Sequence, residues 1–281
     1  MSNAQHRYRP IAHECEVAVI GGGPAGAAVA RLLALWGRDV VLVTAPSDPT
    51  RDLAVSLPPS VAKLLAEIGV LDAVDAAGFV RSTGNTVWWG DKEPRSRAFA
   101  DGTAGYQVRH RDFDRVLLAA AEAAGAKVIR DATVREADVE RQPTRLSGDV
   151  DGVPFTVDAA MVLDASGPQG VVAKARGRRV EAGARTIALV GTWHRDGGWE
   201  VPGDSHTLVE SFTAVGRGRF RSSPACGAAA TKRRLAAGWD GRAVDGPLLP
   251  SATRVRSRLR RSAGRQGRRE TTAEASRQPR R

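Results

Sequence analysis

The chain has 281 residues, which allows one large domain or two small ones, and 42% of them are hydrophobic, enough for a packed core. Two cysteines, five histidines without metal-ligand spacing and no long uncharged apolar stretch argue against a disulfide framework, a metal site and a membrane helix. The net charge of +11 is uneven, because residues 215–281 carry +14 and the rest of the chain carries −3.

Residues 1–15 predict a disordered leader, since they lack the apolar run of a signal peptide. With so few cysteines and no targeting segment, we expect a cytoplasmic protein. The next part of the chain predicts a strand over Val17–Ile20, a glycine turn, a helix and a second strand over Val40–Val43. This order of elements is the context in which a glycine turn binds a dinucleotide.

Gly21, Gly23 and Gly26 occupy the three glycine positions of the G-x-G-x-x-G pattern. The first permits a tight turn, the second lets the backbone approach a pyrophosphate, and the third lets the helix pack closely on the strand. Pro24 and Ala25 then open the helix, whose free N–H groups and positive dipole end attract phosphate. We therefore expect these five residues to bind a dinucleotide; the alternative is a plain glycine turn.

The second strand ends at Thr44, where dinucleotide sites usually have Asp or Glu to hold a ribose hydroxyl. A threonine hydroxyl can also bond a ribose, but it is neutral and shorter than a carboxylate. Thr44 is thus a candidate cofactor residue that predicts weaker binding of the adenosine half.

Between residues 45 and 110 the sequence predicts short helices that alternate with strands. A proline-punctuated connection over 48–59 leads into an amphipathic helix that starts after Ser60 and stops at Gly69. The other expected elements are a short helix over 72–77 and strands over 85–89 and 105–109.

From residue 111 a helix over 111–124 is followed by β-rich runs. Asp151-Gly152 is a hairpin signal, so the antiparallel strands around it form an insertion over about 131–158. The strands of this insertion are expected over 133–140, 144–150 and 153–157. A strand over 127–130 precedes them, and 161–163 is expected to return to the parallel sheet. The sequence predicts an α/β fold, a Rossmann-like three-layer dinucleotide-binding domain over 16–183 with a small antiparallel insertion.

Strands over 187–194 and 207–212 predict the start of a second β-layer, over 184–214, that remains incomplete. From residue 215 onward Arg, Gly, Ala, Ser and Pro dominate without a coherent apolar face, and such a composition cannot offset its ordering entropy. We expect a disordered basic tail over 215–281. It has no recognisable nucleic-acid module, so specific nucleic-acid binding is not expected, although a basic-tail binder is the alternative.

Four motifs in order give the chain a family resemblance. They are Gly21–Gly26, Ser56-Leu57-Pro58-Pro59, Gly84–Gly90 with its Trp-Trp-Gly end, and Tyr106–Asp114 followed downstream by Asp164-Ala165-Ser166-Gly167. Over residues 16–213 this set resembles FAD-dependent oxidoreductases of the p-hydroxybenzoate hydroxylase-type fold, and within them the flavin-dependent halogenase-like branch.

The resemblance implies FAD as cofactor, with NAD(P)H as a candidate electron donor, a small organic substrate and a separate flavin reductase. It implies flavin-dependent monooxygenation, with halogenation or an inactive fragment as alternatives. It nominates Arg111 and Asp164 to Gly167 as FAD contacts. For Arg111 a surface ion pair with Asp112 or Asp114 is an equal alternative; for the second segment it is an ordinary turn.

The chain also departs from the resembled family. Halogenase-like enzymes have a lysine just before the third motif, where this chain has Arg81-Ser82-Thr83, and their Trp-x-Trp-x-Ile-Pro signature is absent. A codon set for Val215–Arg221, read in another frame, encodes Trp-Ala-Trp-Ser-Val-Pro. We therefore hypothesise that the range 215–281 is truncated or frameshifted coding; the alternative is a genuine basic tail, and the gene sequence around codon 215 decides between them. No catalytic residue is assigned.

Overall fold

The computed structural model describes residues 11–47, 52–89, 93–176, 186–194, 205–212, 215–223, 226–234 and 256–259. The chain divides into two compact units. Unit 1 comprises residues 1–52, 63–77 and 111–181, and unit 2 comprises residues 53–62, 78–110 and 182–281. Within unit 2, the strand that begins at Gly84 pairs with the strand that begins at His206.

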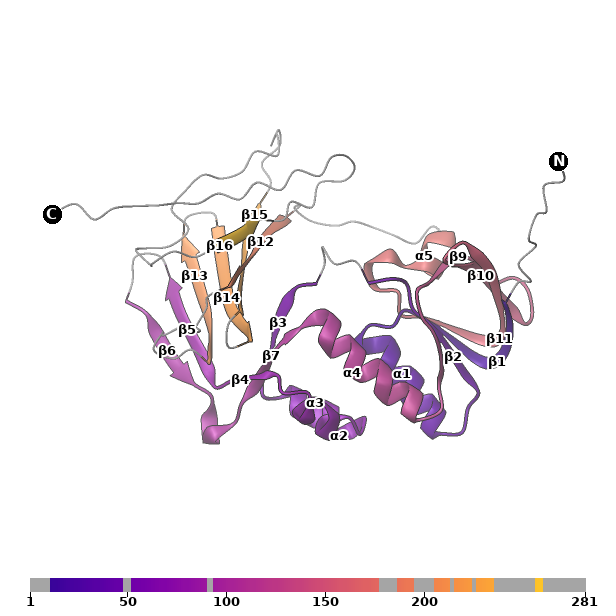
Figure 1. The fold of residues 1–281 in the computed structure, drawn as a ribbon, viewed down its shortest axis with the longest axis horizontal. Helices are drawn as coiled ribbons and strands as arrows, with labels where there is room; N and C mark the ends of the chain where they lie inside the picture. Colours follow the sequence, from indigo (N-terminus) through magenta and orange to yellow (C-terminus); the bar gives the residue numbers. More distant parts are fainter. Residues whose placement is uncertain are drawn as a thin grey trace. The chain divides into compact units, whose positions relative to one another are not determined.

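Unit 1 contains a six-stranded sheet in the order β8-β2-β1-β11-β10-β9 (Figure 1). Its strands are β1 (Ile11–Ile20), β2 (Val40–Val43), β8 (Lys127–Ile129), β9 (Ala132–Asp138), β10 (Thr144–Val150) and β11 (Val153–Asp164). β1 is parallel to both β2 and β11, while β10 is antiparallel to β9 and β11. The expected α/β fold, with a parallel sheet and an antiparallel insertion, is thus confirmed.

Both faces of β2 and of the end of β1 (Val17–Ile20) are buried, and their side chains alternate between two cores. On one face Val17, Val19, Val40 and Leu42 pack with Ala30 of α1 (Pro24–Leu35) and Ala121 of α4 (His110–Ala123). Figure 1 shows these two helices beside β2. This alternation with both faces covered is typical of a parallel sheet between layers.

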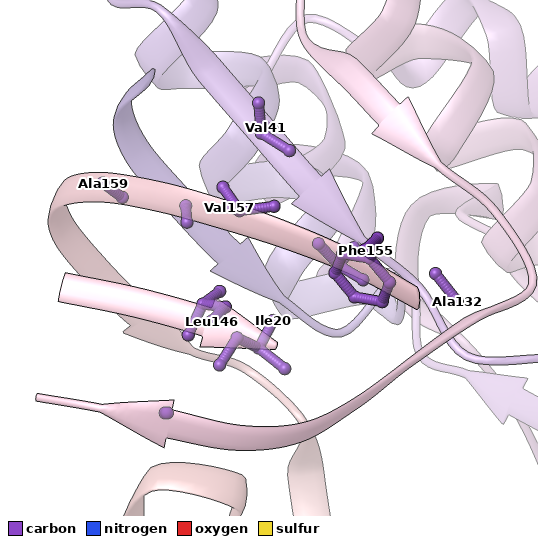
Figure 2. Close-up of a cluster of buried hydrophobic side chains, with 10 residues drawn as sticks. Ile20, Val41, Ala132, Leu146, Phe155, Val157 and Ala159 are labelled. Carbon is purple, nitrogen blue, oxygen red and sulfur yellow. The ribbon is translucent and has the colours of Figure 1, made fainter. Parts of the chain in front are cut away.

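The opposite face is closed by the antiparallel strands. Figure 2 shows Ile20 and Val41 of the parallel strands clustered with Leu146, Phe155 and Val157 of β10 and β11. Phe155, Leu146 and Val157 are at most 1% exposed. The insertion therefore supplies much of the core on this side of the sheet.

The two runs expected over 153–157 and 161–163 are one continuous strand, β11. It pairs antiparallel with β10 over residues 153–159 and parallel with β1 over residues 155–164, so the two pairings overlap in its middle. The hairpin before it is confirmed, since Asp151 and Gly152 have φ values of 49° and 80°. β1 also starts earlier than expected: residues 11–15 belong to the predicted leader, yet they pair with Phe155–Ala159, which holds them in the sheet.

Unit 1 also contains the short helices α3 (Leu71–Ala76) and α5 (Val171–Ala175), and the helix α2 (Val61–Glu67) crosses the boundary between the units. Gly69 ends the α2 segment at φ 67°, as its pattern predicts.

Unit 2 holds a seven-stranded sheet and a three-stranded sheet. The first has the order β16-β12-β15-β14-β13-β5-β6 and the second β3-β7-β4. The bounds are β3 (Ala54–Leu57), β4 (Val80–Ser82), β5 (Gly84–Trp89), β6 (Arg95–Ala98), β7 (Gly105–Arg109), β12 (Thr186–His194), β13 (His206–Phe212), β14 (Val215–Ser223), β15 (Cys226–Arg234) and β16 (Arg256–Leu259).

The last three of these strands fall within the range 215–281 for which the composition predicts disorder. β14 pairs with β13 and with β15, and β16 pairs with β12, each antiparallel. Strand pairing uses main-chain N–H and C=O groups, so a composition poor in apolar residues does not by itself prevent it. The rest of that range lies outside the described residues.

Candidate dinucleotide site at the carboxyl edge of the unit 1 sheet

Three parallel strands of unit 1 end side by side. Ile20, the last residue of β1, is in register with Val43 of β2 and with Asp164 of β11. Past these ends, the Gly21 N–H donates to the Val43 carbonyl at 2.8 Å, and the Ala165 N–H donates to the Ile20 carbonyl at 2.8 Å. The carboxyl edge of a parallel sheet is where open α/β folds bind their ligands.

The glycine turn is held by contacts that leave no room for side chains at two of its positions. Gly21 has φ +109°, and a Cβ added there would lie 2.4 Å from the Ala165 carbonyl oxygen. A Cβ at Gly26 would lie 1.9 Å from the Gly21 carbonyl oxygen. These are the tight turn and the close helix packing that the glycine spacing predicts.

Gly23 differs from both, because among the described residues no atom outside its chain neighbours and its own helix lies within 4 Å of the position its Cβ would take. It is the N-cap of α1, no side chain caps the helix, and the first turn has no acidic residue. Pro24 at the first position has no N–H, so Ala25 and Gly26 supply the orphan donors that a helix start leaves. Open space before an uncapped 12-residue helix fits a pyrophosphate.

Thr44 lies directly beside the glycine turn. Its N–H donates to Ile129 at 2.9 Å and its carbonyl accepts from Ala132 at 3.0 Å, so its backbone is fixed. A Cβ added to Gly22 would lie 2.4 Å from the Thr44 Oγ1 atom. The hydroxyl therefore points at the turn, where the sequence places a ribose contact.

Arg111 is the second residue of α4, and its N–H donates to the Asp52 Oδ1 atom at 3.3 Å. Its guanidinium Nε is buried and has no hydrogen-bond partner in the described part of the chain. Leu118, seven residues later on the same helical face, lies 3.2 Å from the Cβ position of Gly22. Arg111 is thus about 10 Å along α4 from the glycine turn, and its orphaned donor fits an anionic group that the protein itself does not supply.

Asp164 is engaged within its own turn. Its carboxylate accepts from the Ser166 hydroxyl at 2.5 Å, from the Ser166 N–H at 3.1 Å and from the Val172 N–H at 2.8 Å. The Ser166 hydroxyl in turn accepts from the Val171 N–H at 3.0 Å. The N-cap of α5 is Gly170, which has no side chain, and Asp164 and Ser166 instead bond the first free N–H groups of this helix.

Burial acts to raise the pKa of Asp164, but hydrogen bonds from Ser166 and from the start of α5 outweigh it, so the pKa lies below its ordinary value of 3.8. A lowered folded-state pKa stabilises the protein above 3.8, and this stabilisation is lost as the pH falls through the lower folded value. We expect Asp164→Asn to destabilise the protein at pH 7 and to weaken the loss of stability between pH 5 and 3, measured as urea midpoints. An unchanged pH profile would contradict the capping role.

Gly167 follows this turn with φ +62°, and nothing lies within 4 Å of its Cβ position. A hollow of about 400 Å³ lies here, lined by Asp164, Gly167, Gly170, Val172, Ala173 and Arg176. Of the residues predicted from sequence, the structure gathers the glycine turn, Thr44, Asp164 and Gly167 at the ends of adjacent strands, with Arg111 on the helix packed beside them.

Sequence reasoning missed two contributors. Gly22 must be glycine because the Thr44 side chain leaves no room for a Cβ at this position. The run of three glycines, Gly21 to Gly23, is the sequence feature that indicates it. Arg176 lines the hollow although it lies 12 residues beyond Asp164, and no pattern in the chain marks it.

In the described part of the chain, no three or more His, Cys, Asp and Glu side chains are grouped to hold a metal ion. The helices described there are also too short or too polar for any of them to cross a membrane.

Comparison with known proteins points to flavoproteins. The chain is 33% identical over 186 residues to tryptophan 2-halogenase of Chondromyces crocatus, covering 63% of this chain and 35% of that enzyme. Its fold matches the myxobacterial chondrochloren halogenase CndH, with a TM-score of 0.67 at 24% identity over 79% of this chain and 53% of CndH. It also matches aklavinone-11 hydroxylase in complex with FAD and aklavinone, with a TM-score of 0.64 at 20% identity over 78% and 46% of the two chains.

The chain thus spans about a third of the length of the tryptophan 2-halogenase and about half the length of these solved structures. The family model for the FAD binding domain matches residues 14–279, a range that includes most of the predicted tail. Together with the glycine turn and its open N-cap, this match shows that the chain belongs to the FAD binding domain family, whose cofactor is FAD.

Proposed function

We propose that this chain is the FAD-binding part of a flavin-dependent oxidoreductase of the halogenase and monooxygenase kind, acting on a small organic substrate. The observation that carries the proposal is the open space at Gly23 before the uncapped start of α1. The halogenase relatives support the reaction class. A separate flavin reductase, drawing on NAD(P)H, is the proposed source of electrons.

In this proposal different residues of the site bind different parts of the cofactor. The N–H groups of Ala25 and Gly26 donate to the diphosphate across the bare backbone of Gly23. Thr44 bonds a ribose hydroxyl, and the Arg111 Nε donates to the diphosphate. Asp164 acts indirectly, because its carboxylate holds the Ser166–Gly167 turn that faces the cofactor.

FAD, once bound and reduced, supplies oxygen activation. The chain's own contribution described here is to bind the diphosphate, orient the cofactor and hold the turn after β11 rigid. No side chain is assigned a proton-transfer step.

The choice between halogenation and hydroxylation rests on one observation in unit 2. The segment 81–83, where the resembled family has lysine, has Arg81, whose guanidinium lies 4.2 Å from the Tyr106 ring centroid. A guanidinium stays protonated and is a poorer nucleophile than a lysine amine. This favours hydroxylation over halogenation, which is the alternative reaction. Purified protein supplied with reduced flavin, oxygen, bromide and a panel of aromatic substrates distinguishes the two by the mass of the product.

The cofactor assignment is tested by Gly23→Ala. We expect FAD affinity to fall tenfold or more, because the added methyl group occupies the space that the diphosphate needs. The free energy of unfolding of the apoprotein should stay within about 0.5 kcal/mol of the original, since no other segment among the described residues lies within 4 Å of that position. Affinity is measured by quenching of flavin fluorescence.

Purified protein that shows no flavin absorbance near ~450 nm, and whose melting temperature does not respond to added FAD, would refute the proposal. If Gly23→Ala and the original chain bind FAD with equal affinity, the diphosphate does not bind at this turn.

A further inference from the structure

The residue after β2 decides how a dinucleotide site treats the 2′ position of the adenosine ribose. An acidic residue there bonds the 2′-hydroxyl and disfavours a 2′-phosphate, whereas a nearby arginine accommodates the phosphate. In this chain the position is Thr44, which is neutral and offers one hydroxyl.

The side chain of Thr44 is placed to take this role. Both backbone polar groups of Thr44 are bonded to the neighbouring strand region, which fixes the residue at the edge of the sheet. Its Oγ1 lies 2.4 Å from the position that a Cβ on Gly22 would take, so the hydroxyl faces the glycine turn. The hydroxyl has no hydrogen-bond partner among the described residues.

Arg130, which follows the neighbouring strand β8, is not available to bind a 2′-phosphate either. Arg130 follows Ile129, the residue that accepts the Thr44 N–H, and both terminal nitrogens of Arg130 donate to the Glu122 carboxylate. This bond and the charge of Asp131 both raise the pKa of Arg130. The guanidinium is therefore already paired with acids of the protein.

From this arrangement we propose that Thr44 makes the ribose subsite indifferent to a 2′-phosphate, so that adenine dinucleotides with and without it compete equally for the glycine turn. The inference rests on the proposed function, because it assumes that the adenosine half of FAD binds here. It adds that the chain lacks the usual discrimination against 2′-phosphorylated nucleotides.

The test uses NAD⁺ and NADP⁺ as matched competitors, since they share the adenosine diphosphate and differ only in the 2′-phosphate. Each is titrated against the FAD complex, and displaced flavin is followed by fluorescence. For the original chain we expect the two dissociation constants to agree within about threefold. Thr44→Glu should bind FAD about tenfold tighter and should disfavour NADP⁺ relative to NAD⁺ tenfold or more.

Two further variants test the inference even if the glutamate of Thr44→Glu distorts the turn. Thr44→Val removes only the hydroxyl, so affinity for all three ligands should fall together by about two- to tenfold, with the NADP⁺ to NAD⁺ ratio unchanged. Ser47→Glu adds the same charge three residues further on, at an exposed position, and should leave the ratio as it is.

A tenfold or greater preference of the original chain for NAD⁺ overturns the inference while leaving FAD binding intact. So does a Thr44→Val variant whose affinities match the original. If the original chain binds neither FAD nor the competitors, the proposed function fails and the inference fails with it.

Discussion

Gly26→Ala is expected to destabilise unit 1 by about 2–4 kcal/mol and to abolish FAD binding. The added Cβ would lie 1.9 Å from the Gly21 carbonyl oxygen and 3.3 Å from the Ala165 Cβ, so α1 must move away from the glycine turn. An alanine in a helix gains about 1 kcal/mol over glycine, but overpacking of fixed backbone costs about 3 kcal/mol or more. The backbone overlap therefore outweighs the helix propensity.

The measurement is urea unfolding followed by far-ultraviolet circular dichroism. Gly23→Ala is the matched control, because it adds the same methyl group three residues earlier, where no other segment of the described structure lies within 4 Å. The two variants separate folding from binding: both lose FAD, but only Gly26→Ala loses stability. A Gly26→Ala protein that unfolds at the same urea concentration as the original would disprove the tight packing of α1 on the turn.

Arg31→Met is expected to cost about 2–4 kcal/mol of stability. Its guanidinium donates to three carbonyl oxygens, at 2.8 Å to Ile68, at 2.9 Å to Gly69 and at 2.7 Å to Ala120. The first two follow the C-terminus of α2 and the third lies in the last turns of α4. One side chain of α1 thus satisfies carbonyls at two helix ends, where the dipole also favours a cation.

A buried hydrogen bond from a charged donor contributes about 1.5–3 kcal/mol. The three bonds of Arg31 are part-buried or exposed, so each contributes less and the total stays at about 2–4 kcal/mol. Methionine preserves much of the aliphatic bulk while removing all three. Arg38→Met is the control, since Arg38 makes a single exposed ion pair with Glu16 at 3.5 Å. Such a pair contributes less than about 1 kcal/mol. Equal costs for the two variants, in thermal or urea unfolding, would mean that the three bonds of Arg31 add nothing beyond a surface charge.

The local elements of unit 1 could be predicted because each depends on neighbours in the sequence. The strand over Val17–Ile20 and the helix after Gly26 follow from hydrophobic periodicity and glycine spacing. The hairpin at Asp151-Gly152 follows from residues that tolerate positive φ. These patterns, with the family resemblance, were enough to predict an FAD-binding α/β fold, which the family match confirms.

The candidate site was predictable to a lesser degree. The sequence nominated Asp164 as a cofactor contact, and only the structure shows its carboxylate bonded to Ser166 and to the start of α5. The orphaned Nε of Arg111 likewise appears only when α4 is packed beside the glycine turn. Whether a polar side chain is occupied or available depends on partners that arrive from other elements.

By itself, then, the sequence determined the βαβ start, the glycine turn and the family. The tertiary structure alone decided that β11 is one strand with two kinds of neighbour, that Arg31 joins three helices, and that residues 53–62 and 78–110 belong with unit 2. The reason is that turns and periodic faces are set by residues a few positions apart. Strand partners and the bonds of long side chains are instead set by segments that meet only after the chain has folded.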